Sequence, residues 1–207
     1  PLEETFFRGI YKLMPGHMLL YKNGNYEIKT YFKAKLAPRL LGSKKDLEQL
    51  QFQLSRILTD SVRHHMLSDV EVGAFLSGGV DSGYLAVASG VKQAFSVGFD
   101  EGELYNEVDK AAEIAKKAGI KHHVRIISKQ EFWDALPDVM YHMDEPLADA
   151  SAVALYFLSK EAADHVKVVL SGEGADELFG GYNIYREPEA LKKIAWIPFG
   201  VRRVIGK

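Results

Sequence analysis

The sequence contains no cysteine among its 207 residues. This absence excludes disulfides, thiolate metal ligands and cysteine nucleophiles within the chain, and it fits a reducing compartment, so we expect a cytoplasmic protein. Signal-peptide patterns and apolar runs long enough to span a bilayer are also lacking. The formal net charge is only −2, which offers no excess of positive charge to nucleic acid or an anionic membrane. We therefore expect neither of these as a partner.

The residues that are present describe an ordinary globular protein, 47% hydrophobic and 26% charged. The length suits one full domain, or one domain with part of another. The chain begins at Pro1 and ends in the apolar and basic stretch "WIPFGVRRVIGK". We expect both ends to be cuts in a longer protein.

The N-terminal part predicts a β-hairpin. In "HMLLYKNGNYEI" (17–28), apolar runs flank Asn23-Gly24, and this dipeptide suits the positive φ angles of a type I′ turn. A lone hairpin is marginally stable in water, so we expect its sheet partners elsewhere. Residues 33–45 follow as a linker, with Pro38 and Gly42 as breakers.

The rest of the chain alternates between helical and strand patterns. Apolar residues recur at helical spacing over 46–67. The strands predicted after this helix are 70–76, 94–99, 123–127 and 166–170, and the further helices are 82–89, 103–117, 129–142 and 151–163. This alternation predicts an α/β fold, a parallel twisted sheet with helices on both faces. Ligands of such sheets bind beyond the carboxyl ends of the strands, at the switch point in strand order.

The first loop of interest, Ser77-Gly78-Gly79-Val80-Asp81-Ser82, follows the first of these strands. Its glycines permit close approach to an anion, and the helix that follows would point free N–H groups at that anion. Asp81 could hold Mg²⁺ together with phosphate oxygens. The lysine of the GxxxxGK[ST] loop is missing, and so is a GxGxxG pattern. The alternative reading is a tight strand–helix turn without a ligand.

The second loop, Ser171-Gly172-Glu173-Gly174-Ala175-Asp176-Glu177, follows the last strand. Three carboxylates within five residues repel one another unless a cation is near. A solvated acidic turn is the alternative, but the interleaved glycines and the apolar strand ahead of the loop favour a site. If the two strands are neighbours, Asp81 and Asp176 would hold one Mg²⁺–pyrophosphate from two sides, which points to cleavage between the α- and β-phosphates.

These loops carry a resemblance to a known family. "LSGGVDS" (76–82) resembles the loop of the ATP pyrophosphatases, which transfer AMP to an oxygen and release pyrophosphate. "LSGEGADELFGGY" (170–182) resembles the second signature of the glutamine-dependent asparagine synthetases and their β-lactam-forming relatives. "ETFFRGIYKLMPGHMLLYKNG" (4–24) resembles the end of that family's glutaminase domain.

The resemblance implies the domains, the fold and the reaction. Residues 1–32 would be the remnant of a glutaminase domain, 33–45 a linker, and 46–207 a synthetase domain of the adenine nucleotide α-hydrolase type without its C-terminal part. The implied reaction is ATP-dependent amidation of aspartate through β-aspartyl-AMP, with ammonia from glutamine. ATP and Mg²⁺ are the implied cofactors, and a homodimer is one oligomeric state to consider.

The resemblance also implies roles for particular residues. Asp81 and Asp176 would be the metal ligands, and Glu173 the general base or orienting group for ammonia. The residues implied in binding ATP are Leu76, Ser77, Gly78, Gly79, Asp81, Ser82, Val97, Ser171 and Gly172. Asp144, Glu145 and Asp149, in "DEPLADASA" (144–152), fall where the family forms part of its acceptor pocket. For these three acids a helix N-terminus that favours carboxylates is an equally good explanation.

Departures from the family leave alternatives open. The family's glutaminase nucleophile is a cysteine, so this chain cannot hydrolyse glutamine by that route. The segment 144–152 lacks the threonine- and arginine-rich version of the family, so a ligase with another acceptor, β-lactam formation included, is one alternative. An ATP-binding fragment without turnover is another. An RNA-modifying enzyme of the thiolation type is disfavoured, because cysteine and a basic surface are both lacking.

Two histidine pairs, His64-His65 and His122-His123, are candidates for metal ligands. Adjacent residues point to different sides of a helix or strand, so neither pair makes a natural two-ligand site. We interpret these histidines as polar surface or strand-end residues.

Overall fold

A computed structural model describes residues 3–35, 42–100, 107–146 and 148–187. The chain divides into two compact units, Pro1–Asp60 with Gln130–Tyr156 and Ser61–Lys129 with Phe157–Lys207. Part of the predicted linker, and residues 103–106 of a predicted helix, lie outside the described residues. Among the described residues, no helix combines the length and apolar character that a membrane crossing requires.

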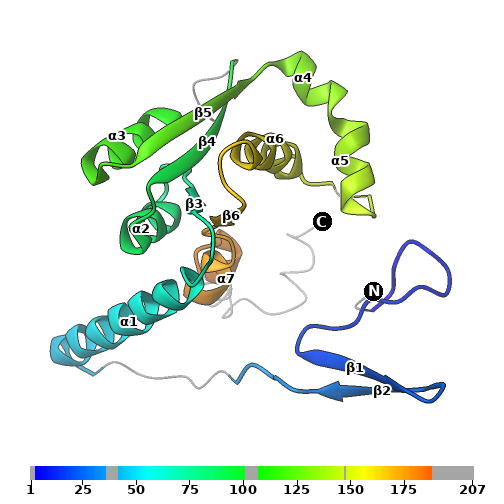
Figure 1. Cartoon of the computed structure of the whole chain (residues 1–207). Coiled ribbons are helices and arrows are strands. Elements are labelled where there is room, and N and C mark those ends of the chain that lie inside the picture. The colour runs from blue at the N-terminus through cyan, green and yellow to red at the C-terminus, as the bar shows by residue number, and fades with distance from the viewer. Residues whose placement is uncertain (1–2, 36–41, 101–106, 147, 188–207) are drawn as a thin grey trace, which may run out of the picture. The chain divides into compact units, whose positions relative to one another are not determined.

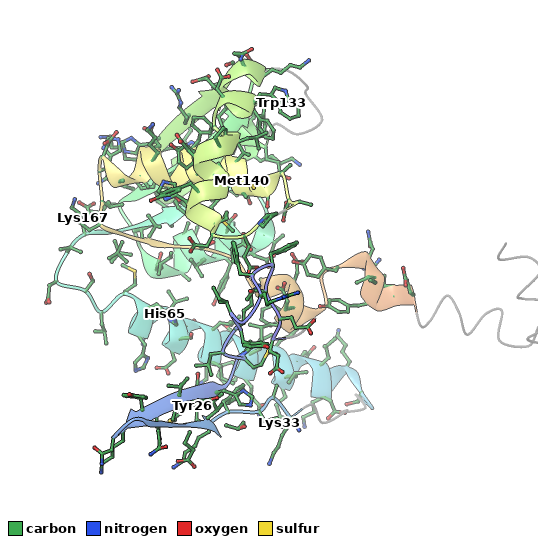
Figure 2. The ribbon with its side chains drawn as sticks, turned by 90° about the vertical axis from the view of Figure 1, so that its right-hand side faces the viewer. Tyr26, Lys33, His65, Trp133, Met140 and Lys167 are labelled. Atoms are coloured by element: carbon green, nitrogen blue, oxygen red, sulfur yellow. The ribbon has the colours of Figure 1, made fainter. Side chains whose placement is uncertain are left out.

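The predicted hairpin is confirmed in the first unit. Strands β1 (His17–Lys22) and β2 (Asn25–Thr30) pair antiparallel, with Tyr21 opposite Tyr26. The turn residues Asn23 and Gly24 have φ angles of 53° and 80°, as a type I′ turn requires. Tyr26, labelled in Figure 2, is 70% exposed. The hairpin thus buries little apolar surface of its own within the described residues.

Helix α1 (Lys44–His65) begins at a capping motif formed by Ser43 and Asp46. The Ser43 hydroxyl accepts the backbone N–H of Asp46 at 3.2 Å and donates to the Asp46 carboxylate at 2.8 Å. The N-cap therefore places the start of this helix two residues earlier than its apolar periodicity predicts.

The predicted helix over 129–142 is wrong in one respect, since the structure has two helices there. Helix α4 (Lys129–Asp134) ends before Ala135, and α5 (Leu136–Met143) begins directly after it. Pro137 stands in the first turn of α5, where the missing N–H costs nothing, whereas inside a continuous helix it would remove a hydrogen bond. Helix α6 (Ser151–Ala163) matches its predicted bounds.

The second unit is built on a four-stranded parallel sheet in the order β5-β4-β3-β6. Its strands are β3 (Val72–Phe75), β4 (Gln93–Phe99), β5 (Lys121–Ile127) and β6 (Val168–Leu170). The chain adds β4 and β5 on one side of β3 and then returns to add β6 on the other side. The switch point of strand order therefore lies between β3 and β6.

Helices cover both faces of this sheet, as Figure 1 shows. Helices α2 (Val80–Ser89) and α3 (Val108–Ala118) pack on one face. The buried cluster on that face consists of Val72, Ala74, Leu76, Ala86, Val91, Ala94, Ala111, Ala115, Ile120 and Leu170. On the other face Phe95 packs with Ala162 of α6 and with Val166. The predicted α/β architecture is confirmed.

Two short helices follow β6. They are α7 (Ala175–Phe179) and the 3₁₀ helix η2 (Asn183–Arg186). Neither was predicted, because five- and four-residue helices are too short to show apolar periodicity.

Gly73 provides a test of the packing between β3 and β4. A Cβ there would lie 2.7 Å from the Phe95 ring and 3.3 Å from Val166. Because Phe95 is fully buried and has no room to move, Gly73→Ala should lower the free energy of unfolding by about 1–3 kcal/mol. Urea denaturation of the 207-residue chain measures this change.

Phe95→Leu is the partner variant for a double-mutant cycle. A smaller side chain at position 95 leaves space for the new methyl group, so the double variant should lose less stability than the two single losses combined. Additive losses would contradict the proposed clash.

Candidate functional site

The two glycine-rich loops meet at the switch point, as expected from the sequence. Strands β3 and β6 are paired, with Ala74 opposite Leu170, so the loops that follow them leave the sheet side by side. A Cβ on Gly172 would lie 3.1 Å from the backbone N of Ser82 and 3.5 Å from the carbonyl carbon of Asp81. The absence of a side chain at Gly172 therefore lets the second loop approach the first turn of α2.

Two hydroxyls hold the shape of the first loop. The Ser77 and Ser82 hydroxyl oxygens lie 2.9 Å apart, and the Ser77 N–H donates to the Ser82 oxygen at 3.1 Å. Ser82 in turn donates to the carbonyl of Gly79 at 3.4 Å. Ser82 is a buried polar residue, whereas Ser77 is exposed. Of the two predicted ligand contacts, Ser77 presents its side chain at the surface and Ser82 ties the loop to α2.

Gly78 and Gly79 adapt the backbone to this turn. Gly78 has φ +80°, and a Cβ there would come within 2.9 Å of the Glu107 carbonyl oxygen just ahead of α3. Gly79 is the N-cap of α2 and contributes no side-chain hydrogen bond to it. The first-turn N–H groups of α2 thus have no side-chain cap from their own N-cap residue, an arrangement that suits an anion.

A hydrogen-bond chain that sequence reasoning missed supports the start of this loop. The buried Ser96 hydroxyl on β4 donates to the carbonyl of Leu76. Its oxygen lies 2.6 Å from Nε2 of His122 on β5, and because its only proton goes to Leu76, it accepts from the imidazole N–H. Burial, followed by the nearby charge of His123, lowers the pKa of His122. His122 is thus a strand-end residue, the second of β5, as predicted, but it is half-buried and hydrogen-bonded rather than at the surface.

The two residues expected near the adenine belong to this region. Leu76 is 2% exposed, and its backbone N–H donates to the carbonyl of Phe95 at 2.9 Å. Val97 follows Ser96 on β4 and is half-buried. The hydrogen bonds of Leu76 and Ser96 join the residue that follows β3 to the middle of β4, and both predicted residues are found there.

The second loop concentrates negative charge. Glu173 and Glu177 are exposed, and Asp176 is half-buried in the first turn of α7. The Tyr182 hydroxyl donates to the Glu177 carboxylate at 3.0 Å. That hydrogen bond, and then the negative charges of Glu177, Asp176 and Glu173, raise the pKa of Tyr182. All three acids of the loop therefore contribute to the raised pKa of the Tyr182 phenol.

The absence of a side chain at Gly181 leaves room for the Asp176 carboxylate. A Cβ at position 181 would collide with Oδ1 of Asp176, and the Gly181 N–H donates to the Asp176 carbonyl at 3.0 Å. Ser171, at the start of the loop, accepts the N–H of Glu173 at 3.3 Å. The glycines and the serine of the second motif thus serve the placement of its acidic residues.

The donor set of the two loops fits a magnesium ion. Within the described parts of the chain, no lysine or arginine forms an ion pair with Asp81, Glu173 or Asp176. Carboxylates combined with phosphate oxygens are the ligands that Mg²⁺ prefers. Asp81 and Asp176, each in the first turn of a helix that begins at one of the loops, are the candidates.

The three predicted acceptor residues belong to the first unit. The Glu145 carboxylate pairs with the Lys12 ammonium at 2.6 Å. Asp149 accepts the N–H of Ser151 at 2.9 Å, and this hydrogen bond lowers the pKa of Asp149. Asp149 thereby caps α6, which is the alternative explanation raised by the sequence. Asp144 is exposed and has φ +60° at the end of α5.

The fold and the paired loops define a parallel α/β protein with two glycine-rich loops side by side at its switch point. The asparagine synthase family profile matches residues 53–206, and the chain belongs to this family.

Two relatives cover almost the whole chain. Asparagine synthetase [glutamine-hydrolyzing] 1 of Bacillus subtilis is 43% identical over 99% of this chain. A putative asparagine synthetase [glutamine-hydrolyzing] of Mycobacterium tuberculosis is 41% identical over 100% of it. The chain spans only 32% of each of these proteins. Amidase chyE of Penicillium rubens is 29% identical over 88% of this chain and 30% of its own length.

Among solved structures, a glutamine-dependent NAD+ synthetase from Acinetobacter baumannii in complex with ADP aligns with a TM-score of 0.41. Its sequence is 21% identical, over 75% of this chain and 30% of that one.

The hydrogen-bond chain behind Leu76 generates a prediction for Ser96→Ala. The substitution leaves the Leu76 carbonyl and the His122 N–H without their partner, and should lower the free energy of unfolding by about 1–3 kcal/mol. Chemical denaturation measures this loss.

Ser89→Ala is the matched control, because Ser89 is half-buried and donates to the Ala86 carbonyl at 3.1 Å, at the end of α2. This variant should lose clearly less stability. Equal losses of stability in both variants would contradict the importance assigned to the hydrogen bonds of Ser96 with Leu76 and His122.

Proposed function

We propose that this chain is the ATP-binding part of a glutamine-hydrolysing asparagine synthetase. The observation that carries the proposal is the close approach of Gly172 to the first turn of α2, which joins the two signature loops at the switch point. The names of the Bacillus and Mycobacterium relatives support the choice of reaction. The proposal includes the domain division, with residues 1–32 as a glutaminase remnant, 33–45 as a linker and 46–207 as the synthetase domain.

In the proposed reaction, the side-chain carboxylate of aspartate attacks the α-phosphorus of ATP. The bond between the α-phosphorus and the bridging oxygen breaks, and pyrophosphate leaves. Ser77 and the first-turn N–H groups of α2 would bind phosphate oxygens. Leu76 and Val97 would lie against the adenine. Ser171 and Gly172 would lie near the ribose and the α-phosphate. Asp81 and Asp176 would hold Mg²⁺, which supplies positive charge against the phosphate oxygens.

Ammonia then attacks the acyl carbon of the β-aspartyl-AMP, and AMP departs. The attacking nitrogen loses a proton, and Glu173 would accept it. Glu173 is exposed and lies in the loop beside α2, so it can reach a bound substrate. A general base of this kind contributes about 100- to 10,000-fold to a rate.

Glutamine hydrolysis is not assigned to this chain, which has no cysteine. Ammonia is therefore the nitrogen donor to use when the chain itself is assayed.

The acceptor is the part of the proposal with a competitor. The segment 144–152, which lacks the threonine- and arginine-rich version of the family, leaves a second candidate, a ligase of the same family with another carboxylate acceptor. The two candidates are separated by testing a panel of carboxylates as acceptors and measuring adenylation of each by ATP–pyrophosphate exchange. Exchange that depends on aspartate supports the first candidate, and exchange that depends only on another acid supports the second.

Asp81→Asn tests the proposed metal ligand in the full-length parent protein. Loss of the negative charge should reduce aspartate-dependent ATP–pyrophosphate exchange by about 100- to 1,000-fold, because the charge compensation of the phosphates is lost. The fold should persist, since Asp81 is exposed.

Asp69→Asn is the control for Asp81→Asn, an exposed aspartate ahead of the opposite end of β3. It should retain full exchange. Unchanged exchange in Asp81→Asn would rule out the metal role of this residue.

Glu173→Gln tests the ammonia step. The variant should retain pyrophosphate exchange, while asparagine formation from ammonia falls by about 100-fold or more, because the proton acceptor is lost. Both half-reactions are measured on the same preparation, with Glu113→Gln on the exposed surface of α3 as control. An equal fall in both half-reactions would exclude a role specific to the ammonia step.

A further inference from the structure

A cluster of three side chains in the second unit is not explained by the nucleotide loops. Its members are His123, Glu161 and His165, each of which offers one donor atom, and these atoms lie within 4.8 Å of one another. The imidazole of His165 approaches the Glu161 carboxylate at 3.6 Å. The ring centroids of His123 and His165 are 4.0 Å apart.

Packing on one face of the sheet brings these residues together. His123 lies on β5 directly opposite Phe95 of β4. Phe95 contacts Ala162 and Val166, which places the end of α6 and the following connection over the same strands. The Phe95 ring stacks on His123 at 5.0 Å and on His165 at 5.8 Å, and so forms an apolar floor beneath both imidazoles.

Glu161 and His165 come to the cluster as a pair with i,i+4 spacing. Glu161 is on the last turns of α6, and His165 continues that turn, since its N–H donates to the carbonyl of Ala162 at 3.0 Å. Side chains four residues apart lie on the same side of a helical turn. Lys167, labelled in Figure 2, follows two residues later, directly before β6.

We propose that His123, Glu161 and His165 form a binding site for a divalent transition metal ion of the zinc type. Two imidazoles and one carboxylate are a ligand set that Zn²⁺ accepts, with the fourth position left to water. Mg²⁺ selects oxygen ligands instead, so this site is chemically distinct from the one proposed at Asp81 and Asp176.

A hydrogen-bond chain orients the His123 imidazole for this purpose. The Gln93 amide nitrogen donates to the Glu71 carboxylate at 3.1 Å, which leaves the Gln93 amide oxygen as the acceptor for Nε2–H of His123 at 3.0 Å. Nδ1 of His123 then carries the lone pair. Metal-binding histidines commonly donate their other ring N–H to a carboxylate, amide or carbonyl oxygen in this way.

The charge state of His123 is compatible with metal binding. Burial, followed by the positive charges of His165 and Lys121, lowers the pKa of His123, and Glu161 opposes this shift. A neutral imidazole offers its lone pair without having to release a proton first.

A metal here would connect the sheet's edge strand β5 to the connection between α6 and β6. The nucleotide loops follow β3 and β6, whereas His123 is the third residue of β5. The inference therefore goes beyond the proposed function, and its test requires no ATP, aspartate or ammonia.

The test uses the 207-residue chain after treatment with a chelator. Titration with Zn²⁺ against a chromophoric competitor should give one site per chain with micromolar or tighter affinity. Co²⁺ should bind the same site and show visible d–d absorption of a four- or five-coordinate N/O site. Zn²⁺ should displace this Co²⁺, whereas millimolar Mg²⁺ should not.

Glu161→Gln and His165→Gln should each weaken Zn²⁺ binding by about tenfold or more. His65→Gln is the matched control, an exposed histidine whose Nδ1–H donates to the Ser61 carbonyl at 2.8 Å, and it should bind as the unchanged chain does. Circular dichroism establishes that each variant folds.

Several outcomes would overturn the assignment. These are the absence of a Zn²⁺ site in the unchanged chain, Co²⁺ spectra typical of six oxygen ligands, and unaltered affinity in folded Glu161→Gln. Loss of binding in His65→Gln alone would place the ion at the His64-His65 pair instead. The Co²⁺ spectrum of the unchanged chain decides the matter even where a histidine variant does not fold.

Discussion

The parallel pairing of β3 with β6 is the interaction on which the proposed site depends. These strands are almost one hundred residues apart in the chain, yet Ala74 stands opposite Leu170 in the sheet. Their carboxyl ends therefore release two glycine-rich loops at one point, and the absence of a side chain at Gly172 allows the loops to touch. A sheet that ordered its strands differently would leave each loop as an isolated turn.

Electrostatics gives this junction its chemical character. The helix start behind Gly79 favours an anion, whereas the acids of the second loop favour a cation. A magnesium–nucleotide complex carries both charges, so each half of the junction has a complementary partner in one ligand. The hydrogen bond to Glu177, and then the charges of the acids of this loop, raise the pKa of Tyr182, which is consistent with a negative second loop.

Local rules predicted the hairpin, the alternation of strands and helices, and both loops from residue types alone. They were less successful where a contact between distant elements decides the outcome. The predicted helix continued through Ala135 because the prediction used only the spacing of apolar residues. It left out the preference of proline, here Pro137, for the first turn of a helix. His122 was predicted as a polar surface or strand-end residue, but its hydrogen bond to Ser96 was not predicted, since nothing in its neighbours along the chain indicates that Ser96 and Leu76 lie beside it.

By itself, the sequence determined which residues flank each strand and hence the chemistry available at the switch point, because glycines, serines and acids in a loop act through local backbone geometry. It also determined the family, through two motifs in a fixed order. Only the tertiary structure decided that His123 meets Glu161 and His165. That meeting requires β5 to pair in register with β4 and α6 to pack on Phe95, and both are consequences of burying one shared apolar face.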